Sequence, residues 1–255
     1  MIGFNKPNSL NSKSPLARAK YGYVFGDFFS LIMKYPNNWL FGADDSGDIT
    51  DVENIEHIAK TAKKNLGEIN FITSDCGLDP TDNPEEHETT MSRVNLAQVL
   101  LCLTVLSVGG NAVFKTYVPF ARPMTRSIML LLANSFEKIT LTKQIAGSPG
   151  SSEIYIICQN YVNKNIDFEY LKKRLIDFDP SHDLYMNYPP VFIDFLENAV
   201  ETFINKQVAI IKRNFYYYEN DDILAKHLPI MDEYKKKLAT DWCKIVSLKK
   251  INTHL

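Results

Sequence analysis

Apolar positions in the middle of the chain form short runs that alternate with longer helical patterns. The short runs lie at residues 69–77, 111–117 and 151–158, and a pattern of helical periodicity covers residues 88–107 between the first two. Gly109-Gly110 follows this pattern and predicts the end of the helix. Strands that alternate with helices of this length predict parallel pairing and an α/β fold.

Further elements flank these runs. Residues 51–65 and 124–136 have helical periodicity, and residues 138–143 alternate in polarity and are rich in β-branched side chains, as in a strand. The link from this strand to the strand that begins at Glu153 is short. Because short links join antiparallel neighbours, we expect these two strands to form an antiparallel pair at one edge of the sheet.

The two ends of the chain lack this alternation of strands and helices. Residues 21–35 are apolar and predict a helix that ends before Pro36. After residue 162 we expect helices without strands, at residues 168–178, 191–218 and 223–246. The sequence therefore predicts a sheet domain over residues 1–162 and a helical appendage over residues 163–255.

The predicted helical appendage has two features that bear on function. Near its end, few acids accompany a group of lysines: Lys235, Lys236, Lys237, Lys244, Lys249 and Lys250. We favour a solvated helix face for these lysines, and contact with the phosphates of a nucleic acid is the alternative. For the aromatic cluster at residues 215–218 we favour packing against the sheet domain, and stacking on nucleic-acid bases is the alternative.

The composition narrows the class of protein. The hydrophobic fraction is 45% and the charged fraction 23%, as in ordinary globular domains, and the formal net charge of −2 gives no overall attraction to nucleic acid. The four cysteines lie far apart, which favours reduced thiols in a cytosolic setting. Since the histidines lack metal-ligand spacing and no apolar run reaches roughly 20 residues, we expect no metal site and no membrane span.

Charged residues stand at the ends of three predicted strands. Asp75 follows the first strand, Lys115 lies near the end of the second, and Glu153 opens the third. Ligands of open α/β sheets bind outside the carboxyl ends of the strands. A lysine held between two carboxylates can orient a hydroxyl group and, once neutral, accept its proton. The alternative interpretation is an ordinary cluster of ion pairs at the rim of the sheet.

Four short motifs occur in a characteristic order. They are Gly47-Asp48-Ile49-Thr50, Ser74-Asp75-Cys76-Gly77, the segment from Gly109 to Lys115, and the segment from Ser148 to Tyr155. Together they resemble the FtsJ-type RNA ribose 2′-O-methyltransferases. The similarity covers about residues 38–161 and is greatest to the cap-ribose branch, including versions carried by large cytoplasmic DNA viruses.

The resemblance implies a Rossmann-like methyltransferase sheet and a specific reaction. S-adenosyl-L-methionine would donate a methyl group to a ribose 2′-hydroxyl at the 5′ end of capped mRNA, in the cytoplasm, or in the host cytoplasm if the protein is viral. By carry-over from the family's motif, Lys115 would deprotonate or steer the hydroxyl. Asp75 would set the charge state of the lysine and hold the methyl donor, and Glu153 would orient Lys115 and the ribose. Asp48 matches the acid that binds the adenine end of the cofactor.

The sequence departs from the family pattern at its start. The Gly-rich first strand–helix turn, which holds the methionine part of the cofactor, and the first lysine of the catalytic tetrad have no counterpart. We therefore expect a sheet that is incomplete at its N-terminal side. Three interpretations remain: part of a longer enzyme, a shortened relative that binds RNA or acts as a scaffold, or a subunit completed by a protein partner. Ser148 replaces an arginine that is frequent in the family.

Overall fold

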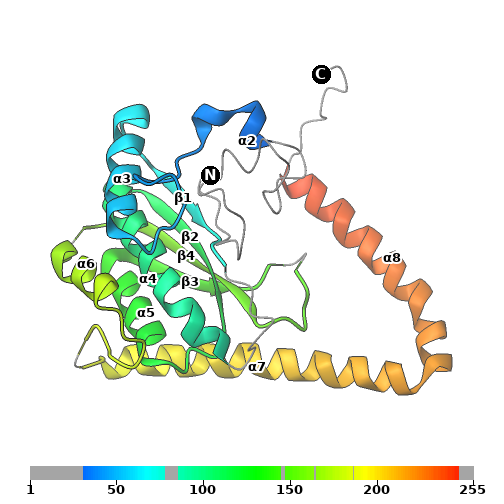
Figure 1. The fold of residues 1–255 in the computed structure, drawn as a ribbon. Helices are drawn as coiled ribbons and strands as arrows, with labels where there is room; N and C mark the ends of the chain where they lie inside the picture. The colour runs from blue at the N-terminus through cyan, green and yellow to red at the C-terminus, as the bar shows by residue number, and fades with distance from the viewer. Residues whose placement is uncertain (1–30, 78–85, 145–146, 164, 186, 247–255) are drawn as a thin grey trace. The chain divides into compact units, whose positions relative to one another are not determined.

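The computed structural model describes residues 31–77, 86–144, 147–163, 165–185 and 187–246. Within these ranges four strands form one sheet in the order β1-β2-β4-β3 (Figure 1). Each overlaps a strand predicted from the sequence, and the α/β class is confirmed. The strands are β1 (Phe71–Ser74), β2 (Asn111–Tyr117), β3 (Phe136–Thr142) and β4 (Glu153–Tyr161).

The direction of the strands differs in part from the prediction. β1 and β2 are parallel and β3 and β4 form the expected antiparallel edge pair, but β2 and β4 are also antiparallel. The expected parallel pairing therefore holds for β1 and β2 but not for β2 and β4. A crossover through helix α5 (Pro123–Ser135) makes β3 parallel to β2. The short link that follows turns β4 back into the space between them, so β4 opposes both neighbours.

Four helices pack together on one side of this sheet (Figure 1). α4 (His87–Val105) contacts α5, α3 (Val52–Leu66) and α6 (Phe168–Ile176), so most of its faces are buried. Alternate strand residues point toward these helices, because side chains of a strand alternate between its two faces. They form the core with α4 and include Ala112, Phe114, Ile154 and Ile156.

The capping residues at both ends of α3 can be recognised in the sequence. The side chain of Asp51 accepts a hydrogen bond from the Glu53 N–H, which caps the helix start. Gly67 ends the helix with φ +68°, a conformation that glycine adopts without a steric penalty. The helix predicted at residues 51–65 is thus confirmed. Of the helix predicted at residues 21–35, the described residues contain α2 (Leu31–Lys34), and the rest lies outside them.

The opposite face of the sheet carries side chains that are exposed or half-buried within the described part of the chain. Phe71 is 62% exposed, and Val113, Lys115 and Tyr155 are half-buried on the same face. The sheet therefore has one covered face, which stabilises it, and one accessible face, which carries the predicted lysine.

The compact unit that contains the sheet continues beyond the boundary expected after residue 162. The chain divides into the units Met1–Ile204 and Asn205–Leu255. Side chains from α6 and from the start of α7 (Pro190–Glu219) extend the core, because each helix presents an apolar face. These side chains are Leu171, Leu175, Phe192 and Leu196.

In the second unit, the described residues comprise the end of α7 and the whole of α8 (Asp221–Val246). The predicted helices of this region are confirmed. Phe215, Tyr216 and Tyr218 are 63%, 50% and 82% exposed. Packing of this cluster against the sheet domain stays a prediction. No helix among the described residues is both long and apolar enough to cross a membrane.

Candidate active site

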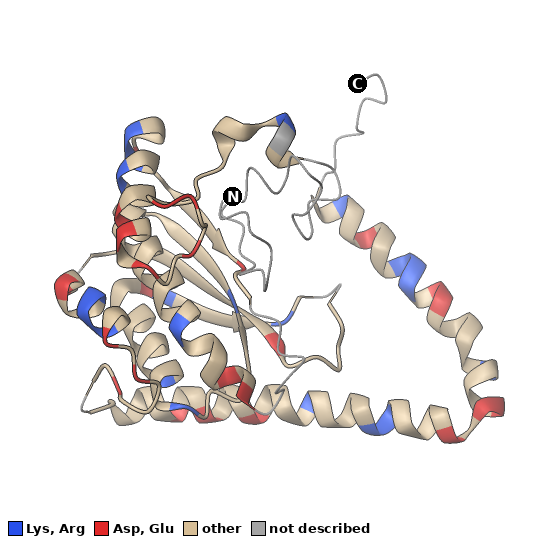
Figure 2. Cartoon of the chain, viewed as in Figure 1, with Lys and Arg blue, Asp and Glu red and all other residues tan. Residues whose placement is uncertain are grey.

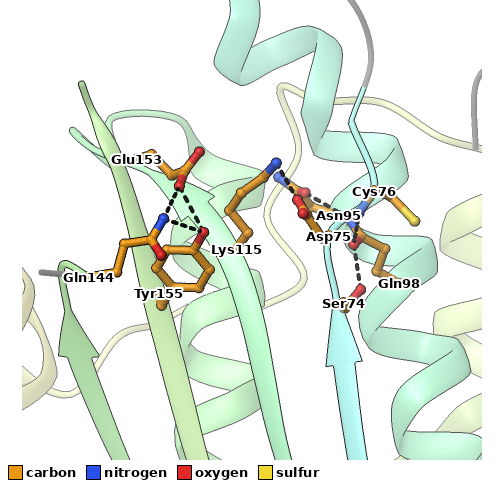
Figure 3. A network of polar contacts seen from close by, with 9 residues as sticks. All are labelled: Ser74, Asp75, Cys76, Asn95, Gln98, Lys115, Gln144, Glu153 and Tyr155. Atoms are coloured by element: carbon orange, nitrogen blue, oxygen red, sulfur yellow. Dashed lines mark hydrogen bonds and ion pairs between the residues drawn. The ribbon is translucent and has the colours of Figure 1, made fainter. Parts of the chain in front are cut away.

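An acid and a lysine meet at the ends of two parallel strands. β1 pairs with β2 up to Ser74 opposite Phe114, so the next residues, Asp75 and Lys115, are neighbours. Lys115 Nζ forms an ion pair with Asp75 Oδ1 (Figure 3). The lysine side chain is 16% exposed and the aspartate side chain 68%. A largely buried ammonium group is therefore paired with an accessible carboxylate. This meeting of Asp75 and Lys115 was predicted from the sequence.

The electrostatic surroundings of Lys115 favour its charged form. Partial burial lowers the pKa of the ammonium group, but the hydrogen bond to Asp75 and the fields of Tyr117, Asp75 and Glu153 outweigh burial, so the net pKa is raised. Lys115 Nζ also lies 5.9 Å from the centre of the Tyr117 ring, within cation–π range. Lys115 is therefore a cation at neutral pH in this structure, suited to donating a hydrogen bond to a substrate oxygen.

Gln98, a buried residue of α4, holds the segment that carries Asp75. Its Oε1 accepts hydrogen bonds from the Ser74 hydroxyl and, at 2.9 Å, from the Cys76 N–H (Figure 3). Its Nε2 donates to Asn95 Oδ1 at 3.1 Å. Both neighbours of Asp75 are thus fixed by one side chain. Gln98 was not predicted from the sequence, although a glutamine inside a helix that is apolar on most faces indicates a buried polar partner.

Glu153 lies on the other side of Lys115, at the start of β4. In the antiparallel register, Tyr155 opposes Lys115 and Glu153 opposes Tyr117. Glu153 Oε1 accepts hydrogen bonds from the Tyr155 hydroxyl at 2.8 Å and from Gln144 Nε2 at 3.3 Å (Figure 3). Burial, together with the hydrogen bond and charge of Glu153, raises the pKa of Tyr155 to about 12. Glu153 therefore acts on Lys115 through its field and through the side chains beside it.

His87, the first residue of α4, also borders this group and was not singled out from the sequence. Its ring packs edge-on against the Tyr117 ring, with the centroids 4.6 Å apart. Burial and the positive charge of Lys115 lower the pKa of the imidazole. Because a lowered pKa favours the neutral form, His87 lines the site without adding a second cation at neutral pH.

Asp48 lies in the loop before α3, outside the network of Figure 3. Its Oδ1 accepts hydrogen bonds from the Thr50 N–H at 2.9 Å and the Thr50 hydroxyl at 2.7 Å. The buried Asn54 fixes the loop, since its Oδ1 accepts from the Ala43 N–H at 2.6 Å and its Nδ2 donates to the Asp48 carbonyl at 2.9 Å. The acidic loop is therefore held in one conformation by side-chain contacts.

The acids near the site do not form a metal-binding group. No group of three or more His, Cys, Asp or Glu side chains could hold a metal ion among the residues that the structure describes. Burial raises the pKa of the Cys76 thiol to about 12, which makes it a poor ligand and nucleophile at neutral pH. The described side chains at this site offer hydrogen bonding, charge and orientation.

Comparison with known proteins identifies the family to which this arrangement belongs. The profile of the FtsJ-like methyltransferases matches residues 29–161. The chain belongs to the FtsJ-like methyltransferase family. The matched range contains Asp48, Asp75, Lys115 and Glu153 and ends close to the predicted boundary at residue 162, whereas the compact unit continues to Ile204.

Three relatives of this FtsJ-like chain are viral or cap-specific proteins. It is 34% identical over 204 residues to an uncharacterized protein of Acanthamoeba polyphaga mimivirus, covering 76% of this chain and 25% of that protein. It is 30% identical over 200 residues to the cap-specific mRNA (nucleoside-2′-O-)-methyltransferase 2 of Drosophila melanogaster, covering 73% and 28%. It is 25% identical over 235 residues to an African swine fever virus protein described as a "probable methyltransferase", covering 87% and 54%. The chain thus spans about a quarter to about half of the length of these relatives.

Proposed function

We propose that this chain takes part in the methylation of a ribose 2′-hydroxyl near the 5′ end of capped mRNA, with S-adenosylmethionine as the methyl donor. The observation that carries the proposal is the Lys115–Asp75 ion pair at two adjacent strand ends, in a member of the FtsJ-like family. The similarity to a cap-specific 2′-O-methyltransferase of Drosophila melanogaster supports mRNA as the substrate class. For a viral chain, the host cytoplasm is the expected location.

Lys115 positions the acceptor oxygen in this proposal. Its pKa is raised, so its ammonium group donates a hydrogen bond to the 2′-oxygen and fixes one lone pair in line with the methyl group. Asp75 holds the ammonium group in place, and Glu153 keeps Tyr155 and Gln144 along the side of the site. Departure of the hydroxyl proton requires a base, and because Lys115 is charged the acceptor is the accessible Asp75 carboxylate or water.

The described residues fit part of the methyl donor. S-adenosylmethionine supplies an electrophilic methyl group on a sulfonium cation, and the accessible Asp75 carboxylate is suited to a cationic neighbour. Asp48 would accept hydrogen bonds from the adenosine end. The 340 Å³ cavity between α5 and α6 is not lined by Asp75 or Lys115, so it is not part of this site.

A second candidate function follows from the Gly-rich turn of the family, which has no counterpart in this sequence. An FtsJ-like chain whose donor site stays incomplete would act as an RNA-binding or scaffold subunit. Isothermal titration calorimetry of the chain with S-adenosylmethionine separates the two functions. Micromolar binding supports the methyltransferase, whereas absence of binding together with retained affinity for capped RNA supports the scaffold.

Transfer of labelled methyl groups to capped RNA tests the proposal directly. The chain is incubated with labelled S-adenosylmethionine and capped RNA, and the product is digested to nucleosides. We expect label in a 2′-O-methylated nucleoside. Label in a base, or equal labelling of RNA with a 2′-deoxyribose at the accepting position, would refute the assignment to ribose 2′-hydroxyls.

A further inference from the structure

Helix α8 carries an apolar stripe but is not buried. It is 26 residues long and contains no buried residue. Along it, apolar side chains recur every three or four residues, a spacing that places them on one helix face. Leu228, Tyr234 and Trp242 of this stripe are 46%, 61% and 44% exposed. The complete stripe comprises Leu224, Leu228, Met231, Tyr234, Leu238, Trp242 and Ile245.

Acids predominate in the first half of α8 and lysines in the second, although bands of both signs occur along the helix (Figure 2). Residues 221–233 contain four acids and one lysine, whereas residues 234–246 contain four lysines and one acid. The two halves therefore carry net charges of equal size and opposite sign, and the helix as a whole is neutral. The intrahelical pairs of Lys235 with Asp232 at 3.5 Å and of Lys244 with Asp241 at 3.4 Å are exposed. Exposed pairs of this kind contribute little, so the charges stay available to a partner.

We propose that α8 is a self-association surface on which the α8 of a second copy of this chain packs in antiparallel orientation. In an antiparallel pair centred on Tyr234, the acidic half of each helix lies along the basic half of the other. The two-fold axis repeats each favourable contact, as in other isologous dimers. A parallel pair would instead place like charges together along its whole length. The apolar stripes of the two copies then cover each other.

The charge pattern favours a second copy over other occupants. An anionic membrane or an RNA backbone attracts the basic half of α8 and repels the acidic half, so a neutral helix gains little from either. A second copy satisfies both halves at once. At 26 residues the helix is about 39 Å long, which gives the stripe room for several layers of paired side chains.

The mass of the whole chain in solution tests the proposal. Sedimentation equilibrium at about 50 µM is expected to give a dimer of about 58 kDa, twice the chain mass of 29.2 kDa. Leu238→Asp/Trp242→Asp is expected to be a monomer, with circular dichroism confirming that the helices remain. A wild-type protein that is monomeric at this concentration overturns the proposal. Binding of that monomer to RNA or to lipid vesicles would not rescue it.

Charge reversal tests the antiparallel arrangement. Asp232→Lys/Glu233→Lys makes the centre of α8 entirely basic, and Lys235→Glu/Lys236→Glu removes most of its positive charge. For each variant alone, the dissociation constant of the dimer is expected to be at least tenfold higher than for the wild type. An equal mixture of the two variants is expected to dimerise. Lys212→Glu/Arg213→Glu on α7 is the matched control and should stay dimeric. Reversal variants that dimerise like the wild type, or a mixture that stays monomeric, contradict the arrangement.

Discussion

Asp75 and Lys115 form their ion pair one residue beyond the last paired position of the parallel strands β1 and β2. The lysine is largely covered and the aspartate largely exposed, so substrate can reach the carboxylate while the ammonium group stays aligned. Parallel pairing is responsible for this geometry, because it brings the carboxyl ends of two strands to the same edge.

The ion pair makes the stability of the protein sensitive to alkaline pH. The folded-state pKa of Lys115 is raised above its ordinary value of 10.5, so the pair's contribution is complete below that value and is lost as the pH rises through the folded pKa. We expect the free energy of unfolding to fall above about pH 10.5, and to fall less steeply in Lys115→Met. Urea unfolding at a series of pH values measures both slopes. Equal slopes for the two proteins would contradict a raised pKa of Lys115.

Gln98 is expected to stabilise the protein through the segment around Asp75. Gln98→Leu leaves the Ser74 hydroxyl and the Cys76 N–H without their acceptor, at a cost of about 1–3 kcal/mol for a buried unsatisfied group. Urea denaturation measures this loss. The control Gln159→Leu changes an exposed glutamine of β4 and is expected to stay within about 0.5 kcal/mol of the wild type. Equal effects of the two substitutions would show that Gln98 has no special role.

Gly42 is expected to be essential to the loop that contains Asp48. Its φ is +94°, and an added Cβ would lie 2.3 Å from the side chain of the buried Asn54. Gly42→Ala is therefore expected to cost more than 2 kcal/mol, from strain and overlap together. Gly67→Ala is the matched control, because Gly67 has φ +68° but no atom within 4 Å of its Cβ position, and it should cost about 1 kcal/mol. Thermal unfolding of both variants checks the order.

The sequence predicted the elements of the fold better than their directions. Hydrophobic periodicity located all four strands and the helices α3 to α8, because the core-facing side chains follow the period of each element. The insertion of β4 between β2 and β3 depends on tertiary packing, so no local pattern could reveal its antiparallel direction. Packing of Phe215, Tyr216 and Tyr218 against the sheet domain could not be decided from the sequence, because an aromatic cluster has the same composition whether it is packed or exposed.

For the site, the sequence was informative where a residue stands at a strand end. Asp75 and Lys115 were found in this way, and the structure brings them into contact. Gln98 was missed, because its position inside an apolar helix indicates a buried polar partner but does not identify Ser74 and Cys76 as that partner. Whether Asp48, Asp75, Lys115 and Glu153 act in methyl transfer stays a prediction that kinetic measurements must test.

Methyl transfer by Lys115→Ala tests the central claim most directly. Single-turnover transfer from labelled S-adenosylmethionine to capped RNA is compared for the wild type, for Lys115→Ala and for Lys138→Ala, which removes an exposed lysine of β3. We expect Lys115→Ala to lower the transfer rate at least 100-fold with little change in RNA affinity, and Lys138→Ala to leave the rate within about twofold. A Lys115→Ala rate equal to that of the wild type would contradict the account.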